Sequence, residues 1–576
     1  MKHNHNLDTG SGRGDVTQPL LHTIGSGALG GKAQGLVAMK DLLNSQFDAD
    51  DYPDCDISIP RMTVLCSDIF DIFIERNNLE EIIHTGVPDN RLALAFQQAD
   101  LPLEILGELR TLISKNHLPL AIRSSSLLED TSHEPFAGVY ATKIIPNNQF
   151  DINTRFRRLI EAIKFVYAST FFQPARDYMK ITGHTLEDEK MAVIIQEVIG
   201  NKHGQRYYPE ISGVARSYNF YPMDRETHQE GIIHLALGLG KTIVDGGISW
   251  SYSPAHPKVK PPYRTVDELL KLTQTEFWAV NMGEPPEYNP IKETEYLVQE
   301  DLITAENDGV LPYLASTYDP HANRLTIGTG SDGPRVLTFG RILVLEDIPL
   351  NDIIKKLLAI SENAQAGPVE IEFAMTLNPH RFGFLQVRPL VVSESEVTLE
   401  DEELCGNQVL LSSRNVLGNG INRDLQDILF VPPHKFQPKH TQAIAQELKR
   451  HNRRLVDEGR AYLLIVFGRL GTTDPWLGIP LRWEGVSGAK AVVETTKEDF
   501  NIVLSQGSHY FHNLINLGIH YFSIPSSSEF DIDWDWLQQQ NTLNETEFIH
   551  HIQLSTPLQI KVDGRSGKGV VLKPRE

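Results

Sequence analysis

The stretch at residues 120–140, LAIRSSSLLEDTSHEPFAGVY, constrains this chain most. An apolar strand at 118–122 is followed at once by Arg123 and three serines, so the pattern predicts a strand that delivers an arginine into a group of hydroxyls. The fork of guanidinium donors, with neutral hydroxyls beside it, is suited to holding an anion. A surface turn with a capping serine would use the same residue types, and the pattern leaves both interpretations open.

A second junction between polar and apolar sequence lies at residues 20–43. A run of glycines ends at Gly31, Lys32 follows, and an amphipathic pattern begins, so we expect a glycine loop that leads into a helix and suits a phosphate. The loop matches GxGxxG, but the segment before it is short and polar for the first strand of a dinucleotide fold. A Walker A loop would need glycine at Ser26 and Ser or Thr at Ala33, so a plain glycine turn is the remaining alternative.

Residues 191–199 form a nearly continuous apolar run that is interrupted by Gln196 and Glu197. The run predicts a buried strand, and polar groups at its end would suit the edge of a nucleobase. An ordinary strand that leaves the core has the same pattern, so the sequence favours neither interpretation. Residues 211–222 predict another strand, and residues 151–180 predict a long helix.

Residues 367–390 predict a β-hairpin with charged and amide side chains on both strands. Side chains alternate along a strand, so Glu370 and Glu372 share one face of the first strand, and Gln386 and Arg388 share one face of the second. Pairing in register would bring a carboxylate, an amide oxygen and an arginine together, which is what a magnesium–phosphate complex needs. A cross-strand Glu–Arg salt bridge on a solvated face is the alternative.

The totals of the chain exclude several classes of protein. Its 576 residues suggest roughly two to four domains, and its net charge of -22 argues against a broad nucleic-acid or anionic-membrane surface. No apolar run reaches the roughly 18–20 residues of a membrane span. Residues 1–20 look like a flexible tail without the apolar core of a signal peptide, and the three cysteines form no CxxC pair. We therefore expect a cytoplasmic protein with no nucleic-acid or membrane partner.

Four stretches occur in the order of the N-terminal ATP-binding domain of phosphoenolpyruvate synthase and pyruvate phosphate dikinase, and the chain resembles that family over residues 21–395. They are GGKAQGL at 30–36, AIRSSSLLED with FAG within 121–138, SGV at 212–214 with GLG at 238–240, and VEIEFA with LQVRPL within 369–390. Each stretch is short, whereas all of them in the family's order are specific. The resemblance implies an α/β (α+β) protein with an ATP-grasp fold, in which two lobes clamp Mg-ATP.

The resemblance also implies roles for individual residues. These are phosphate binding and charge balance by Lys32, Arg123 and Arg388, magnesium binding by Glu372 and Gln386, and nucleotide contacts by Gln196, Glu197, Val198, Gly238 and Gly240. The chemistry agrees, because cations neutralise a triphosphate and oxygens hold a hard metal ion. Two positions depart from the family: Lys241 stands where it usually has glutamate, and Ala255 stands where it commonly has aspartate.

Residues 400–576 predict a smaller C-terminal α/β domain, with a helix at 441–458. We find neither the family's mobile phosphohistidine motif nor the roughly 250 residues that its pyruvate-binding barrel would need. His509 follows a glycine-serine turn and precedes an apolar helical run, a setting that is similar to the family's phosphate acceptor. A helix cap at Ser508 with a packed histidine is the plainer alternative.

Together these patterns favour an Mg-ATP-dependent phosphotransferase of the dikinase type, which would split ATP through a phosphoryl-enzyme intermediate. The alternative is a non-catalytic ATP-binding regulatory or scaffold protein that kept the nucleotide site and lost the acceptor. The complete set of phosphate and metal residues favours the enzyme, whereas the missing histidine motif favours the alternative. The phosphate acceptor, whether a small molecule or a histidine of the enzyme or of a partner protein, stays open, and so does a homo-oligomer.

Overall fold

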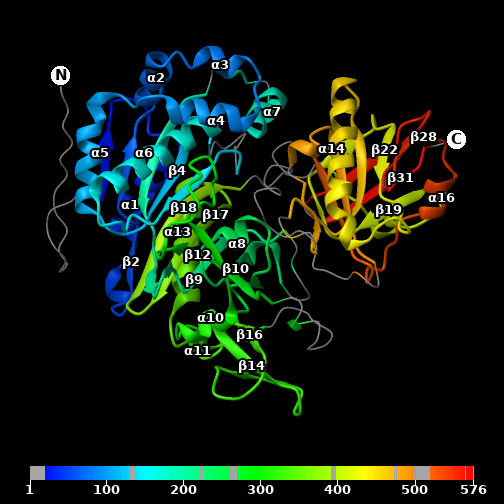
Figure 1. Ribbon diagram of the computed structural model, residues 1–576. Coiled ribbons are helices and arrows are strands. Elements are labelled where there is room, and N and C mark those ends of the chain that lie inside the picture. The colour runs from blue at the N-terminus through cyan, green and yellow to red at the C-terminus, as the bar shows by residue number, and fades with distance from the viewer. Residues whose placement is uncertain are drawn as a thin grey trace.

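The computed structural model describes residues 20–129, 138–182, 184–187, 189–220, 222, 226–259, 269–270, 273–390, 397–472, 474, 476–481, 483–497, 500, 519–564 and 566–574. Helices and strands are mixed along the chain, which confirms the predicted α/β class. Figure 1 shows the blue to green elements in one group and the yellow to red C-terminal elements in a second group beside it. Within these residues, no helix has both the length and the apolar character to cross a membrane.

The first sheet has the strand order β1-β3-β6-β4-β5. Its strands are β1 (Leu21–Ile24), β3 (Met62–Leu65), β6 (Met191–Glu197), β4 (Leu120–Ser126) and β5 (Thr142–Ile145). Its helices are α2 (Ser67–Arg76), α3 (Glu80–His84), α4 (Asp89–Gln98), α5 (Leu103–Lys115), α6 (Ile152–Ser169) and α7 (Gln173–Thr182). β1 runs parallel to β3, whereas β6 runs antiparallel to both β3 and β4. The strand with Arg123 and the strand with Gln196 are therefore neighbours.

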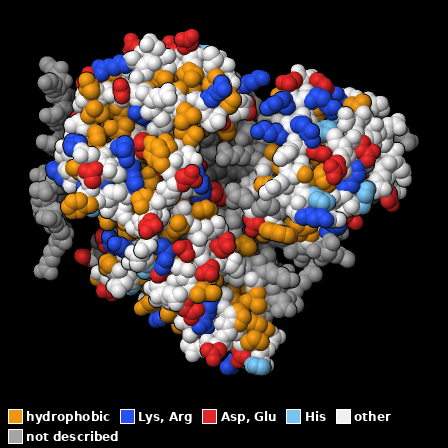
Figure 2. Space-filling view, viewed as in Figure 1, with side chains coloured by type: hydrophobic (Ala, Val, Ile, Leu, Met, Phe, Trp, Pro, Cys, Tyr) orange, Lys and Arg blue, Asp and Glu red, His pale blue; other side chains and the backbone are white. Residues whose placement is uncertain are grey.

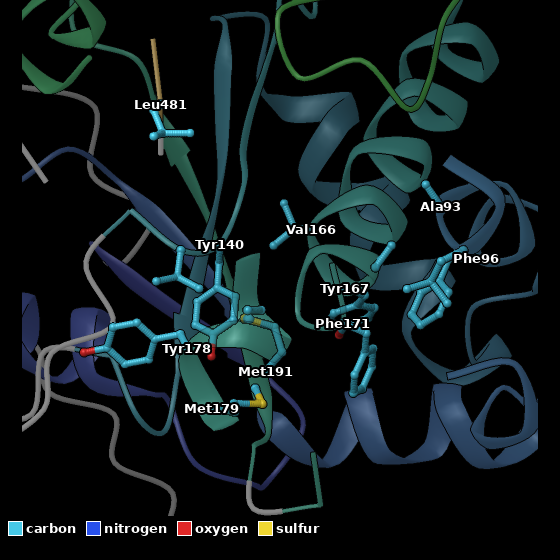
Figure 3. Close-up of a cluster of buried hydrophobic side chains, with 14 of the residues drawn as sticks. Ala93, Phe96, Tyr140, Val166, Tyr167, Phe171, Tyr178, Met179, Met191 and Leu481 are labelled. Carbon is cyan, nitrogen blue, oxygen red and sulfur yellow. The ribbon is translucent and has the colours of Figure 1, made fainter. Parts of the chain in front are cut away.

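Apolar side chains from this sheet and its helices form one core cluster, part of which is drawn in Figure 3. Met191 of β6 belongs to it, and α6 contributes Val166 and Tyr167. The Tyr167 ring lies 5.1 Å from the Phe70 ring, in an edge-on arrangement that aromatic pairs favour. This burial holds β4 and β6 in place, and both strands carry predicted site residues.

Two elements differ from the predicted bounds. β4 does not end near residue 122 but continues to Ser126, because its serines pair with β6 and are buried with hydrogen-bond partners. The helix predicted at 151–180 is divided into α6 and α7, since Phe171 turns into the core between them. Pro174 lies in the first turn of α7, where a missing backbone N–H costs nothing.

The second sheet has the strand order β11-β10-β9-β17-β18-β2. Its strands are β11 (Trp250–Tyr252), β10 (Ile232–Ala236), β9 (Ile211–Arg216), β17 (Val369–Leu377), β18 (His380–Pro389) and β2 (Asp56–Ser58). α13 (Leu350–Gln365) packs against β9 and β17. α1 (Gly31–Gln46) packs against β4 of the first sheet and β18 of the second, so it lies between the two sheets. Side chains from both sheets can therefore meet beside the start of α1.

Two smaller sheets lie on the same side of the molecule as the second sheet (Figure 1). Their strand orders are β13-β12-β8-β7 and β15-β14-β16. Their strands are β7 (Asn201–His203), β8 (Arg206–Tyr208), β12 (Glu276–Asn281), β13 (Leu297–Asp301), β14 (Ala315–Asp319), β15 (Arg324–Ile327) and β16 (Arg335–Leu337). The short helices here are α8 (Lys241–Val244), α10 (Leu302–Asn307), α11 (Leu311–Leu314) and α12 (Gly340–Leu343).

The segment at residues 288–296, which we call the strap, joins this side to the first sheet. Lys143 of β5 is only 1% exposed, and its Nζ lies 2.7 Å from Glu295 Oε2 and donates to the Pro290 carbonyl at 2.7 Å. The Arg158 guanidinium of α6 lies 5.1 Å from the centre of the Tyr296 ring. A buried ammonium is tolerated here because a carboxylate and a carbonyl partner it.

The C-terminal elements form sheets with the orders β20-β27-β26-β23-β22-β29-β28, β19-β31-β30-β21 and β24-β25. The strands are β19 (Val409–Ser413), β20 (Val416–Leu417), β21 (Gly420–Asn422), β22 (Asp427–Phe430), β23 (Tyr462–Phe467), β24 (Arg469–Leu470), β25 (Gly478–Ile479), β26 (Ala489–Thr495), β27 (His520–Ile524), β28 (Thr542–Glu545), β29 (His550–Gln553), β30 (Gln559–Asp563) and β31 (Lys568–Leu572). The helices are α14 (Thr441–Asp457) and α16 (Trp534–Gln539), and α14 ends one residue before its predicted end.

The C-terminal elements contact the N-terminal part of the chain at two kinds of surface. Arg469 Nη1 donates a hydrogen bond of 2.8 Å to the carbonyl of Gly246, which follows α8. Leu481 belongs to the same core cluster as Tyr178 of α7, and both are labelled in Figure 3. One contact is therefore polar and specific, and the other is apolar.

Candidate functional site

Arg123 connects the two sheets. Its Nη2 donates to Gln386 Oε1 at 2.7 Å and lies 3.4 Å from Glu372 Oε2, both on the second sheet. Its Nη1 donates to the Leu385 carbonyl at 2.9 Å and to Gln196 Oε1 at 3.2 Å. We call Arg123, Gln196, Glu372 and Gln386 the two-sheet cluster. The structure thus brings together four residues that the sequence analysis assigned to ATP and magnesium.

The β17–β18 hairpin places its residues by register. Glu372 pairs with Gln386, and Glu370 pairs with Arg388, which is the pairing that the alternation of side chains required. On the other side of β17, Glu370 pairs with Arg216 of β9. Two adjacent rows of polar side chains therefore cross the second sheet, one at the two-sheet cluster and the other beside it.

The second row is a buried group of three charges. Arg388 Nε donates to Glu370 Oε1 at 2.7 Å, and Arg216 Nε donates to Glu370 Oε2 at 2.6 Å. All three residues are at least 96% buried, and the carboxylate is held between two guanidinium groups. Arg216 was not predicted from the sequence. It follows the SGV stretch at 212–214 and shares a strand face with Val214, the last residue of that stretch. The register that sets Arg216 opposite Glu370 depends on tertiary structure.

Lys32 lies in a separate charged group at the start of α1. Its Nζ is 2.5 Å from Glu129 Oε1 and donates to Ser124 Oγ at 3.1 Å. Glu129 is 1% exposed and also accepts hydrogen bonds from Ser124 Oγ at 2.9 Å and from the Ser126 backbone N–H at 3.0 Å. Glu129 was not singled out from the sequence, because an acidic residue after a serine run reads equally well as a solvated turn.

The serine hydroxyls are hydrogen-bonded within the protein, whereas the sequence suggested that they would donate to a bound anion. Ser124 donates to Glu129, and Ser125 donates to the Leu29 carbonyl at 2.8 Å. The Ser126 hydroxyl accepts from the Glu129 backbone N–H at 3.1 Å. Because β4 continues through the serines, they are buried in the sheet and hold Glu129 and the start of α1 in place.

The glycine loop lets α1 approach β4 closely. The Ala33 N–H donates to Ser125 Oγ at 3.0 Å, so one of the unpaired amides of the first helical turn is satisfied by β4. Gly30 has φ 76°, and a Cβ atom there would lie 1.7 Å from the Ser125 carbonyl oxygen. Only glycine fits this contact, and Lys32 is therefore fixed relative to the end of β4.

The predicted adenine strand is divided between two environments. Gln196 points into the two-sheet cluster. The Glu197 N–H donates to the Arg61 carbonyl at 3.0 Å, and the Val198 N–H donates to the Pro119 carbonyl at 2.9 Å. Neither of these two amides is open to an adenine edge in this arrangement.

Gly238 and Gly240 lie after the end of β10, where α8 begins. Gly238 has φ 83°, and a Cβ atom there would lie 2.6 Å from the Trp278 carbonyl oxygen, so the loop needs glycine for its close approach to β12. The Nζ of Lys241, the departure from the family pattern, lies 2.8 Å from Oδ2 of Asp245, the residue that follows α8. The glycines shape this loop, and the lysine takes part in a local ion pair.

A second buried acid lies near the Lys32 group. The Tyr140 hydroxyl donates to Glu189 Oε2. Burial raises the pKa of Glu189 to about 7, and the charge of Glu129 adds to the increase. Burial, together with the neighbouring Glu189, also raises the pKa of Tyr140 well above its usual range. Glu189 therefore changes its charge near neutral pH, close to the carboxylate that pairs with Lys32.

The oxygens of Glu372 and Gln386 fit a magnesium ion, because both face the same Arg123 nitrogen and so converge. Magnesium is usually held by one or two carboxylates together with substrate phosphates and water. Over the residues that the structure describes, no group of three or more His, Cys, Asp or Glu side chains could hold a metal. Glu372 and Gln386 alone would leave the other positions of a magnesium ion to phosphates and water.

The structure does not bring all predicted residues to one point. Arg388 lies in the row beside the two-sheet cluster, and Lys32 lies with Glu129 at the start of α1. His509 falls in 501–518, outside the described residues, so the predicted acceptor has no assigned position.

Comparison with protein families finds a match over most of the chain. A family model described as pyruvate phosphate dikinase, AMP/ATP-binding domain, matches residues 26–404. The matched range includes the two-sheet cluster, the Arg216–Glu370–Arg388 group and the Lys32 group. A comparison with curated proteins gives no match.

Proposed function

The chain belongs to the family of pyruvate phosphate dikinase AMP/ATP-binding domains, which have the ATP-grasp fold, and from this premise we propose that it is an Mg-ATP-dependent phosphotransferase. The phosphates of ATP would bind at the two-sheet cluster, with Lys32 and Arg388 beside it. The family match supports ATP as the ligand. The placement of the cationic and oxygen side chains supports phosphoryl transfer and a requirement for magnesium.

The observation that carries the proposal is the position of Arg123 between the sheets. Its guanidinium holds acceptors from β6, β17 and β18. Phosphate oxygens suit the same fork of donors, so a triphosphate could take the place of these acceptors without a change in the geometry of the arginine. A group that contacts both lobes is well placed to balance charge on the transferring phosphoryl group.

The charges of the site support the magnesium requirement. Lys32 pairs with Glu129 and Arg123 pairs with Glu372, whereas Arg388 and Arg216 share Glu370, so these groups together carry one excess positive charge. The protein therefore offers little excess positive charge to a triphosphate. A magnesium ion would supply it by neutralising phosphate oxygens when bound. Calorimetry should accordingly show ATP binding that is weaker by at least tenfold without magnesium; equal affinity would contradict the roles proposed for Glu372 and Gln386.

The transfer step requires a nucleophile that is neutral near pH 7, and a histidine of the enzyme or of a partner protein meets this need. An imidazole nitrogen would form a bond to the β-phosphorus while the bond from that phosphorus to the α-phosphate oxygen breaks, so AMP leaves. Water would take the γ-phosphoryl group and release phosphate. His509 remains our candidate acceptor on the strength of its sequence setting.

Product analysis tests the reaction. The wild-type protein with Mg-ATP should release AMP and phosphate, and ATP labelled at the β-phosphate should leave acid-labile label on the protein. Loss of that label in His509→Ala would support His509, whereas label that persists would move the acceptor to another histidine. ADP as the product would rule out the dikinase chemistry, and binding without turnover would favour a regulatory or scaffold protein.

A further inference from the structure

We propose that Glu129 is a positioning residue of the nucleotide site, which acts through Lys32 by holding its ammonium group at the end of β4. The inference rests on the proposed function, because it concerns the lysine that would contact the phosphates. It assigns a role to the acidic residue that follows the serine run and gives the three buried serines a purpose.

Glu129 is itself held in place by hydrogen bonds to both of its carboxylate oxygens. Oε1 accepts from Lys32 Nζ and Ser124 Oγ, and Oε2 accepts from the Ser126 N–H. The Ser126 hydroxyl in turn accepts from the Glu129 N–H. A carboxylate that is 1% exposed and has donors on both oxygens is fixed in one orientation.

The start of α1, which carries Lys32, is also fixed to β4. Ser125 accepts a hydrogen bond from Ala33 and donates to the Leu29 carbonyl, so it anchors the residues that flank Lys32 to β4. Gly30 allows this contact because a side chain there would meet the Ser125 carbonyl. Alternate serines of one strand thus fix the carboxylate, and the serine between them fixes the helix that carries the ammonium.

The chemical consequence follows from the nature of lysine. Its flexible stem must lose conformational freedom before the ammonium can act at one point, and a fixed carboxylate imposes that loss in advance. The same carboxylate repels a triphosphate, because both are negative. Glu129 should therefore favour turnover through the position of Lys32 and slightly oppose ATP binding through its charge.

A purely structural role predicts something different. If Glu129 only stabilised the end of β4, its loss would loosen the contact between β4 and α1. ATP binding and turnover would then fall together. They would do so whether or not Lys32 is present. The two roles are therefore separated by the direction of the change in ATP affinity and by its dependence on Lys32.

The experiment is a double-mutant cycle on the full chain with Glu129→Gln, Lys32→Ala and the double variant. We expect Glu129→Gln to lower kcat about tenfold while the Kd for Mg-ATP stays the same or falls, and to have no further effect on kcat in the Lys32→Ala background. Glu447→Gln is the matched control, since it removes a buried carboxyl that accepts hydrogen bonds from Thr546 and Phe548 in the C-terminal elements. A rise in Kd equal to the fall in kcat, or the same loss in both backgrounds, would overturn the proposal.

A second measurement does not depend on ATP. In the wild type the Lys32 ammonium is held by Glu129 Oε1 and Ser124 Oγ. Its release from the carboxylate should expose it to an amine-selective acylating reagent, so peptide mapping should show at least threefold faster labelling of Lys32 in Glu129→Gln than in wild type. Unchanged labelling would overturn the pairing of Lys32 with Glu129, whether or not the wild-type protein binds ATP. Absence of ATP binding by the wild-type protein would refute only the proposed function. If Glu129→Gln fails to fold, Glu129→Asp serves in its place: it keeps the charge and should still lower kcat, because the shorter side chain shifts the ammonium.

Discussion

Arg123 holds four acceptors on three strands, so its loss should affect ATP more than the loss of any other single cation. Arg123→Ala should weaken Mg-ATP binding or transition-state stabilisation by on the order of 2–4 kcal/mol, by analogy with donors in sites that exclude water. Titration calorimetry and steady-state turnover measure the two effects. Arg110→Ala is the control, since Arg110 is exposed and contacts the Asn153 side chain and the Phe156 ring of α6, outside the two-sheet cluster. Full activity in Arg123→Ala would remove the two-sheet cluster from the site.

Glu189 makes the stability of the protein depend on pH. Burial raises its pKa from 4.5 to about 7, so the folded protein retains a proton that the unfolded chain releases. The stabilisation of the fold by protonated Glu189 is fully present below pH 4.5 and is lost as the pH rises through 7. Between pH 5 and 8 the free energy of unfolding should fall by about 2.5 kcal/mol from this group.

Denaturant unfolding at several pH values measures this slope. Glu189→Gln should flatten it, because an amide has no proton to release in this range. Glu104→Gln should leave the slope unchanged, since Glu104 is exposed and ionised throughout the range. A wild-type slope that survives in Glu189→Gln would assign the pH dependence to another group.

The sequence indicated some site residues well and gave no means to find others. Arg123 stands out because it follows directly after an apolar strand. Lys32 stands out because it lies between a run of glycines and an amphipathic stretch. Glu129 and Arg216 do not, because their roles depend on the partner across the sheet or loop. Buried charges are recognised by their partners, and partners distant in the chain cannot be read from local pattern.

At the scale of elements, the junction of α1 and β4 is the contact least able to change. Gly30→Ala should lower the free energy of unfolding by more than about 2 kcal/mol, since it adds a side chain at positive φ and against a backbone carbonyl. It should also weaken ATP binding by displacing Lys32. Denaturant unfolding and calorimetry on one sample check both effects.

Gly107→Ala provides the opposite case. Gly107 lies inside α5, and a Cβ atom there would meet nothing within 4 Å. Alanine should therefore raise stability by about 0.5–1 kcal/mol, because glycine is costly inside a helix. If both variants lost stability alike, added bulk rather than the α1–β4 contact would explain the effect of Gly30→Ala.

Elements were predictable where their signal is local. The hairpin of β17 and β18 and the helix α14 have clear period and turn signals, and both form close to their predicted bounds. The division between α6 and α7 was missed, because Phe171 continues the helical apolar pattern while it packs into the core. The extension of β4 was missed because the serines are polar, and only their pairing with β6 explains their burial.

At the scale of the whole molecule, Arg469 is the polar link between the C-terminal elements and the loop after α8. Arg469→Ala should increase amide hydrogen exchange at residues 241–247, because it removes the bond to the Gly246 carbonyl. Exchange in the first sheet should not change. Arg414→Ala is the control, since Arg414 pairs with Asp401 and Glu529 within the C-terminal elements. No change in Arg469→Ala would show that the apolar contact alone holds the two groups together.

The charge of the molecule is not spread evenly. Figure 2 shows Lys and Arg side chains gathered on the C-terminal group, where Lys449, Arg450 and Arg453 of α14 are exposed. This patch is local, in a chain whose net charge is -22. Composition could exclude a broad basic surface but could not reveal a patch on one helix face, and the absence of a nucleic-acid partner stays a prediction.

The strap has a consequence for the way this chain can diverge. Lys143 and Glu295 are both at least 95% buried, and they are separated by about 150 positions in the chain. Loss of either partner alone would leave a buried charge without its counter-ion, at a cost of several kcal/mol. Homologues that change one of these residues should therefore change the other as well. Covariation of positions 143 and 295 would mark the contact between the first sheet and the strap.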